Sequence, residues 1–88
     1  MDDQLDAWRR FDRDLRAFNE DLASAMSALD RRYQDTLPTW DDSVRATLGA
    51  RIETAREPVE GYLRADAGRF EDFVTERIRR LHGYLHGR

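Results

Sequence analysis

Apolar residues recur with helical spacing through the first part of the chain. They fall at alternating steps of three and four residues, which is an unbroken heptad pattern. The row consists of Trp8, Phe11, Leu15, Phe18, Leu22, Ala25 and Leu29. Acidic residues precede it and Arg31 and Arg32 follow it, which suits the dipole of a helix at both ends. The pattern predicts an amphipathic helix over residues 3–34.

A second apolar row predicts another helix over residues 41–86. Its steps are mostly four, four and three residues, a period of about 11 residues per three turns. The row consists of Val44, Leu48, Ile52, Ala55, Val59, Leu63, Ala67, Phe70, Val74, Ile78, Leu81 and Leu85. Tyr62, Phe73 and Tyr84 form a further row, one position away from the first. The C-terminal half therefore has an apolar face that is too wide for a single partner helix.

A short turn over residues 35–40 separates the two helices. Pro38 ends the first helix, because proline disfavours the helical conformation of the residue before it and cannot continue the hydrogen-bond ladder. Thr39 as N-cap and Asp42 three residues later have the spacing of a capping box. So short a connection predicts an antiparallel helical hairpin. Trp40 lies at its tip, either as a packing anchor against both helix ends, which we favour, or as an exposed recognition residue.

Pro58 interrupts the second apolar row. An interior proline costs about 3 kcal/mol of helix stability, and Gly61 loosens the same turn. No residues remain there for a chain reversal, so we predict a kink near residues 57–61 within one continuous helix. A three-helix fold is the alternative. An extra step of four residues between Val59 and Ala67 falls at the same place.

The size of the chain argues that the hairpin associates. Its 88 residues form one domain, residues 1–88, and so small a domain has a marginal core. A hairpin covers only one side of each helix, and the second helix should extend past the first by roughly 12 residues, or about 18 Å. We therefore predict an all-α fold in which two hairpins dimerise into a four-helix bundle, either as a homodimer or with a paralogous hairpin. The predicted interaction face is Tyr62, Leu63, Phe70, Phe73, Val74, Ile78, Leu81, Tyr84 and Leu85.

Composition excludes several classes of partner. The formal net charge of −3 and the lack of a basic stripe argue against nucleic acid. No apolar run reaches the roughly 18 residues that span a bilayer, so we expect no membrane insertion. The N-terminus does not have the pattern of a signal peptide. These features predict a cytoplasmic protein, or one exported by a route that needs no signal peptide.

Candidate chemistry is sparse. There is no cysteine, which excludes disulfides and thiolate metal sites. His82 and His86 have the i,i+4 spacing of a zinc-binding pair, but the glutamate of an H-E-x-x-H motif is missing. The sequence also has no glycine-rich phosphate loop and no pattern typical of a catalytic triad. We predict no enzyme activity and no catalytic, cofactor or metal site.

Two long helices joined by a short turn that contains Trp40 resemble the W-x-G (ESAT-like) family of small type VII secretion proteins. The resemblance covers the architecture of nearly the whole chain, although Asp42 stands where the family has glycine. It implies a noncatalytic hairpin that pairs into a homo- or heterodimeric four-helix bundle, with a secretion ATPase or a larger protein as a further partner. The turn motif of this chain is Pro38, Thr39, Trp40 and Asp42.

The family also has an export element, Tyr-x-x-x-Asp/Glu, near the end of the second helix. Tyr84 is at the right place but is followed at the fourth position by Arg88. Tyr62 and Asp66 fit the letters in the middle of the predicted helix. Two hypotheses follow: a relative of type VII secretion substrates or their partners, or an intracellular adaptor or toxin-partner module that is not exported.

Overall fold

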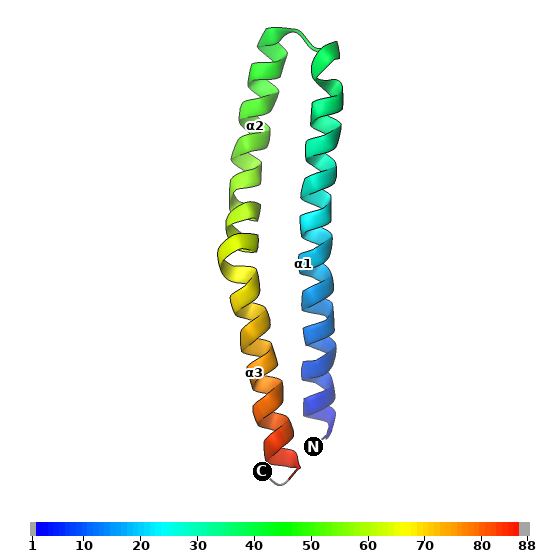
Figure 1. The fold of residues 1–88 in the computed structure, drawn as a ribbon, viewed down its shortest axis with the longest axis vertical. Coiled ribbons are helices and arrows are strands. Elements are labelled where there is room, and N and C mark those ends of the chain that lie inside the picture. The colour runs from blue at the N-terminus through cyan, green and yellow to red at the C-terminus, as the bar shows by residue number, and fades with distance from the viewer. Residues whose placement is uncertain (1, 87–88) are drawn as a thin grey trace.

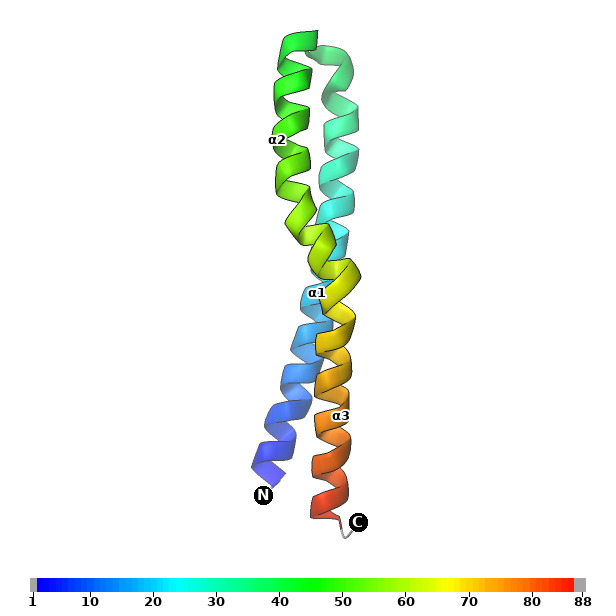
Figure 2. The ribbon, with the colours of Figure 1, turned by 90° about the vertical axis from the view of Figure 1, so that its left-hand side faces the viewer.

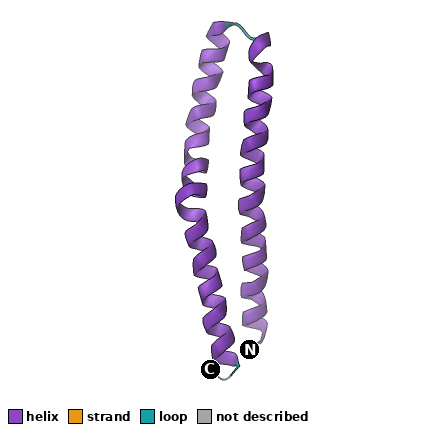
Figure 3. Cartoon of the chain, in the orientation of Figure 1, coloured by secondary structure: helices purple, strands orange, loops and turns teal. Residues whose placement is uncertain are grey.

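Two long antiparallel helical arms make up the protein (Figure 1). The computed structural model describes residues 2–86. The first arm is the single helix α1 (Asp2–Thr36), and a 3₁₀ turn, η1 (Leu37–Thr39), follows it. The second arm consists of α2 (Asp42–Gly61), a π-helical turn, η2 (Tyr62–Asp66), and α3 (Ala67–Leu85). The predicted all-α hairpin is confirmed for the described residues, which are almost entirely helical (Figure 3).

The hairpin is long and thin, with extents of 66 × 18 × 13 Å. The turn lies at one end and the two chain ends lie at the other (Figure 1). Seen from the side, the second arm crosses α1 near the middle of the molecule (Figure 2). Because α1 is longer than predicted and the second arm ends at Leu85, the overhang of the second arm is smaller than expected.

The connection between the arms differs in detail from the prediction. Pro38 lies in the first turn of η1, and the Thr39 hydroxyl donates to the carbonyl of Thr36 at 2.7 Å. The helix then restarts at Asp42, so the residue before it, Asp41, is the N-cap of α2. The predicted N-cap at Thr39 is wrong, because the 3₁₀ turn that contains Pro38 directs the threonine hydroxyl back to the first helix.

Asp41 accepts hydrogen bonds from backbone N–H groups in the first turn of α2. Its Oδ1 accepts a hydrogen bond from the backbone N–H of Val44 at 2.9 Å, and its carbonyl accepts the first helical bond from Arg45 at 3.0 Å. Aspartate is among the strongest N-cap residues. Asp42, the first residue of the helix, adds a second negative charge where the helix dipole favours one.

The core between the arms is small. Among the described residues the buried apolar side chains are Leu5, Ala67 and Val74. The buried and half-buried positions of α1 include Leu5, Trp8, Asp12, Leu15, Asn19, Leu22, Met26 and Tyr33. This row also has heptad spacing, but it is rotated around the helix from the predicted row, whose members Phe11, Phe18 and Ala25 are exposed. The apolar stripe of α1 is wider than the second arm can cover, and its predicted centre was wrong.

The π-helical turn lies where the second apolar row has its extra step. Inside η2 the carbonyl of Tyr62 accepts from the N–H of Ala67, five residues on, in place of the usual four. A π turn takes up one extra residue. The row can therefore contact α1 both from Val59, which is half-buried, and from Ala67 and Val74. Pro58 lies inside α2, and a kink there stays a prediction.

Near the turn, Gly49 allows the arms to approach closely. A Cβ atom at this position would lie 2.7 Å from the hydroxyl of Tyr33 on α1. Glycine therefore makes room for the tyrosine ring to reach across to α2.

Candidate interaction surface

Phenylalanine is exposed throughout this protein. The chain contains four, Phe11 and Phe18 on α1 and Phe70 and Phe73 on α3, and their exposed fractions lie between 50% and 63%. Burying a phenylalanine completely is worth roughly 1.5–3 kcal/mol. A group of exposed large apolar side chains commonly marks a surface that contacts another molecule.

Trp8 joins the phenylalanines of the two arms. Its ring centroid lies 6.3 Å from that of Phe11, with planes 87° apart, and 6.4 Å from that of Phe73, with planes 63° apart. Both contacts are edge-on, a favoured geometry for aromatic pairs. The guanidinium carbon of Arg77 lies 5.9 Å from the Trp8 ring centroid, in a cation–π contact. Phe11 and Phe73 therefore belong to one continuous surface.

Helical spacing extends this surface along both arms. Phe18 lies seven residues after Phe11 on the same side of α1, and Phe70 lies three residues before Phe73 on α3. The ring of Phe70 also lies 6.0 Å from that of Tyr62. We call this surface the aromatic face; it consists of Trp8, Phe11, Phe18, Phe70 and Phe73.

The predicted interaction face is divided by the structure. Phe70, Phe73 and Tyr84 are exposed, whereas Tyr62, Leu63, Ile78, Leu81 and Leu85 are half-buried. Val74 is only 2% exposed, so it belongs to the core of the hairpin and cannot contact a partner. Ala67, Val74 and Leu81 recur every seven residues and form the row that lies against α1.

Phe11 and Phe18 were not predicted as part of the interaction face. The heptad pattern placed them in the seam of the hairpin. A signal was present, because Asn19 lies within the same wide stripe and its amide needed polar partners from the second arm. Pattern alone does not show which part of a wide stripe faces inward.

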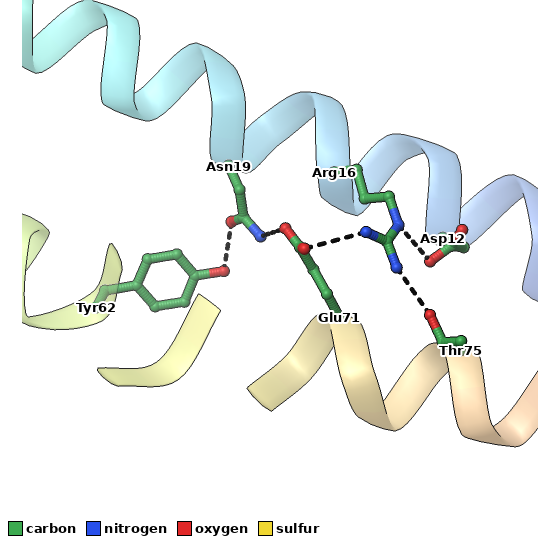
Figure 4. A network of polar contacts seen from close by, with 6 residues as sticks. All are labelled: Asp12, Arg16, Asn19, Tyr62, Glu71 and Thr75. Carbon is green, nitrogen blue, oxygen red and sulfur yellow. Dashed lines mark hydrogen bonds and ion pairs between the residues drawn. The ribbon is translucent and has the colours of Figure 1, made fainter. Parts of the chain in front are cut away.

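Asn19 lies at the centre of a polar network between the arms (Figure 4). It is 6% exposed, and its Nδ2 donates to Oε2 of Glu71 at 2.7 Å. Its Oδ1 accepts from the hydroxyl of Tyr62, also at 2.7 Å. The amide is thus bonded through both of its polar atoms, as a buried polar group needs to be.

Arg16 extends the network along α1 and α3 (Figure 4). Its guanidinium donates to Oε1 of Glu71 at 3.2 Å, to the hydroxyl of Thr75 at 2.7 Å and to Oδ1 of Asp12 at 3.1 Å. An open groove of about 440 Å³ lies beside it. The groove is lined by Arg16, Asn19, Glu20, Ala23, Leu63, Ala67, Gly68 and Glu71.

This polar side lies opposite the aromatic face. Phe18 follows Arg16 by two residues, and Phe73 precedes Thr75 by two residues. Two residues correspond to about 200° around a helix, so each pair points in nearly opposite directions. Since Arg16 and Thr75 bond to each other, the hairpin has one polar side and one aromatic side.

Arg56 holds the arms together nearer the turn. It forms an ion pair with Asp30 across the arms, donates to Oε1 of Glu53 at 2.6 Å, and its Nε lies 3.8 Å from Glu60. Desolvation of the guanidinium on its own would lower the pKa of Arg56. The hydrogen bond with Asp30 and the three negative charges outweigh that effect, so the pKa of Arg56 is raised above its ordinary value.

The two histidines stack on one another at the end of α3. The ring centroids of His82 and His86 lie 4.3 Å apart. Over residues 2–86, no cluster of three or more histidine, cysteine, aspartate or glutamate side chains could hold a metal ion.

Trp40 is 39% exposed at the tip of the hairpin. Its backbone N–H donates to the carbonyl of Leu37 at 3.4 Å, and its own carbonyl accepts from Nε of Arg45 at 3.0 Å. The backbone of Trp40 therefore links η1 to α2, while more than a third of the residue is exposed.

The fold and this surface define an all-helical hairpin with an aromatic face that is left exposed within residues 2–86. No protein-family model matches the chain, and no curated protein or solved structure is significantly similar to it. None of the helices within residues 2–86 is long and apolar enough to cross a membrane.

Proposed function

We propose that this protein is a noncatalytic protein–protein interaction module that binds helices of another chain on its aromatic face. One observation carries the proposal: all four phenylalanines are at least half exposed, while three apolar side chains are buried among the described residues. A chain that leaves its largest apolar groups outside its own core gains most by burying them against a partner.

The accessible surface supports this proposal. The hairpin exposes 6868 Å². A compact monomer of 10.4 kDa should expose about 5,400 Å². The excess of about 1,500 Å² compares with the roughly 800 Å² that each partner buries in a typical stable interface. The elongated hairpin therefore has ample surface for an interface, and its exposed phenylalanines support an interface on one side.

The assembly we propose is a four-helix bundle of two hairpins. The partner is either a second copy or a paralogous hairpin. Packing two aromatic faces together covers the exposed side of α1 and α3 at once. A bend of the second arm near Pro58, where proline removes a helical hydrogen bond, is part of this proposal because it would let α3 follow the surface of a partner.

The biological setting we propose is that of a W-x-G-like protein, related to type VII secretion substrates or their partners. The hairpin, its length and Trp40 within the connecting turn support this relation. Asp42 in place of glycine and Arg88 at the fourth position after Tyr84 favour the second candidate, an adaptor or toxin partner that stays in the cytoplasm. Export that depends on a neighbouring membrane ATPase supports the first candidate, whereas co-purification with one cytoplasmic protein supports the second.

Sedimentation equilibrium tests the role of the aromatic face. A variant with Phe11→Ser and Phe73→Ser should lose association with the partner, whether a second copy or another protein captured at native expression. The matched control is Ala23→Ser with Gly68→Ser in the polar groove, where a Cβ atom at position 68 meets no heavy atom within 4 Å. Loss of association in the control, with intact association of the phenylalanine variant, would contradict the proposal.

A further inference from the structure

Asn19 of α1 bonds to the second arm on both sides of the π-helical turn (Figure 4). Its Oδ1 accepts from the hydroxyl of Tyr62, the first residue of η2. Its Nδ2 donates to Oε2 of Glu71, which follows η2 on α3. We call these two bonds the Asn19 clamp. One buried amide therefore spans the place where the second arm departs from α-helical geometry.

The π turn allows Tyr62 and Glu71 to face the same residue, although they lie nine positions apart. In an uninterrupted α-helix this separation corresponds to about 900°, so the two side chains would point in opposite directions. A π turn takes up one extra residue, which reduces the rotation to about 800° and brings the side chains within about 80° of each other. The contact between the rings of Tyr62 and Phe70, 6.0 Å apart, also crosses η2.

Without the π turn, a different row of α3 would face α1. The present inward row consists of buried and half-buried residues, Ala67, Glu71, Val74, Ile78, Leu81 and Leu85. If η2 became ordinary helix while α2 kept its place, each of them would give its position to the residue before it, because one residue turns a helix by about 100°. Phe73 would replace Val74, and Phe70 would replace Glu71. Both phenylalanines of α3 would then leave the aromatic face and lie between the arms.

Asn19 favours the present row over this alternative row. The present row places the carboxylate of Glu71 opposite its amide, whereas the alternative row would place the ring of Phe70 there. A buried amide needs hydrogen-bond partners, which an apolar ring does not supply. Asp66 and Arg80 belong to the alternative row and add to the preference, because burying a charge is costly.

We infer that the Asn19 clamp holds the π turn in place and so determines which row of α3 faces α1 and where Phe70 and Phe73 point. The inference goes beyond the proposed function, since it does not depend on what covers the aromatic face. Packed helices tend to have discrete arrangements and do not deform continuously. Opening the clamp therefore frees α3 to turn by about 100° and to withdraw its part of the aromatic face.

Cysteine labelling tests the clamp, because the chain contains no cysteine of its own. Phe73→Cys and Val74→Cys are made separately in an Asp66→Ala background. This background removes a charge that opposes the rotated state and that takes part in no ion pair among residues 3–86. Phe73 is 63% exposed and Val74 is 2% exposed. A maleimide should therefore react at least about tenfold faster at position 73 than at position 74.

Asn19→Leu, added to both cysteine chains, should reverse this order. The leucine removes both bonds of the clamp and places an apolar side chain where Phe70 can pack. Position 74 should then react faster than position 73. Labelling at the lowest protein concentration that can be measured keeps association from protecting position 73.

Two control variants separate the clamp from other effects. Glu20→Leu adds the same side chain at the neighbouring, exposed position of α1 and should leave the order of reactivity unchanged. Deletion of Ala65 from the Asn19→Leu chains removes the extra residue of η2. Ordinary helix then keeps Val74 inward, so the original order should return. Circular dichroism confirms that each sample is helical.

Three results would overturn the inference. An unchanged order in the Asn19→Leu chains would show that other contacts hold the π turn. Fast reaction at both positions would show that Asn19 is needed to pack the arms and does not choose between two rows. A reversed order that persists after deletion of Ala65 would show that the rotation does not come from the π turn.

Discussion

The hydroxyl of Tyr62 donates a 2.7 Å hydrogen bond to Oδ1 of Asn19, and so ties the π-helical turn to the middle of α1. Asn19 lies in the row of inward positions between Leu15 and Leu22, where an apolar residue would be expected. A single buried asparagine in a helical seam can fix which residues face each other, because only one alignment satisfies it. We expect this contact to set the alignment of the two arms.

Asn19→Ala should lower the free energy of unfolding by about 1–3 kcal/mol, because Glu71 and the Tyr62 hydroxyl lose a buried partner. Tyr62→Phe should cost about 1 kcal/mol, since it removes one bond and keeps the ring. The double variant should cost less than the sum of the two, as measured by urea unfolding monitored by circular dichroism. Additive effects would show that the two side chains act independently.

Trp40→Ala separates the two roles of the hairpin tip. If the indole anchors both helix ends, removing it should cost about 3 kcal/mol or more of stability, within the range for large aromatic side chains. Because Trp40 is 39% exposed, we expect a smaller loss of stability than this. A measured loss below about 1 kcal/mol, together with weaker partner binding, would assign Trp40 to recognition. Thermal unfolding and a binding titration on the same sample distinguish the outcomes.

Arg56→Gln should lower the melting temperature, because it removes the ion pair between α2 and Asp30 on α1. The pKa of Arg56 is raised in the folded chain, so its contribution to stability is fully present below the ordinary pKa of an arginine side chain and is lost only as the pH rises beyond it. The difference in melting temperature between Arg56→Gln and the wild type should therefore be constant between about pH 6 and pH 9, and it should be smaller at high salt. Arg51→Gln, at an exposed position outside the ion pairs of the described residues, is the matched control. A melting-temperature difference that fell steadily over this pH range would contradict a stabilising role for the ion pair between Arg56 and Asp30.

The helices and the reversal were predictable because their signals are local. Heptad spacing, Pro38 and a short connection are sufficient to define a hairpin, and the extra step between Val59 and Ala67 coincides with η2. The N-cap was harder, because Thr39, Asp41 and Asp42 are all good capping residues within four positions. Which one caps the helix depends on the 3₁₀ turn that contains Pro38.

The direction of the apolar stripe on α1 was not predictable from local pattern. Its inward side includes Asn19, whose partners Tyr62 and Glu71 are 43 and 52 residues away along the chain. With Asn19 facing inward, Phe11 and Phe18 are exposed. The aromatic face therefore depends on contacts between the arms, and no window of sequence contains that information.

The π-helical turn limits where this protein can lose a residue during evolution. A π turn accommodates one residue more than an α-helix at the same place. Loss of one of the exposed residues Arg64 or Ala65 would convert η2 to ordinary helix, while α2 and α3 keep their present faces toward α1. Loss of a residue within α3 would rotate the part of α3 that follows it by about 100° and turn that part of the aromatic face away from its position. Natural variants of the second arm that are one residue shorter should therefore have their gap between residues 62 and 66.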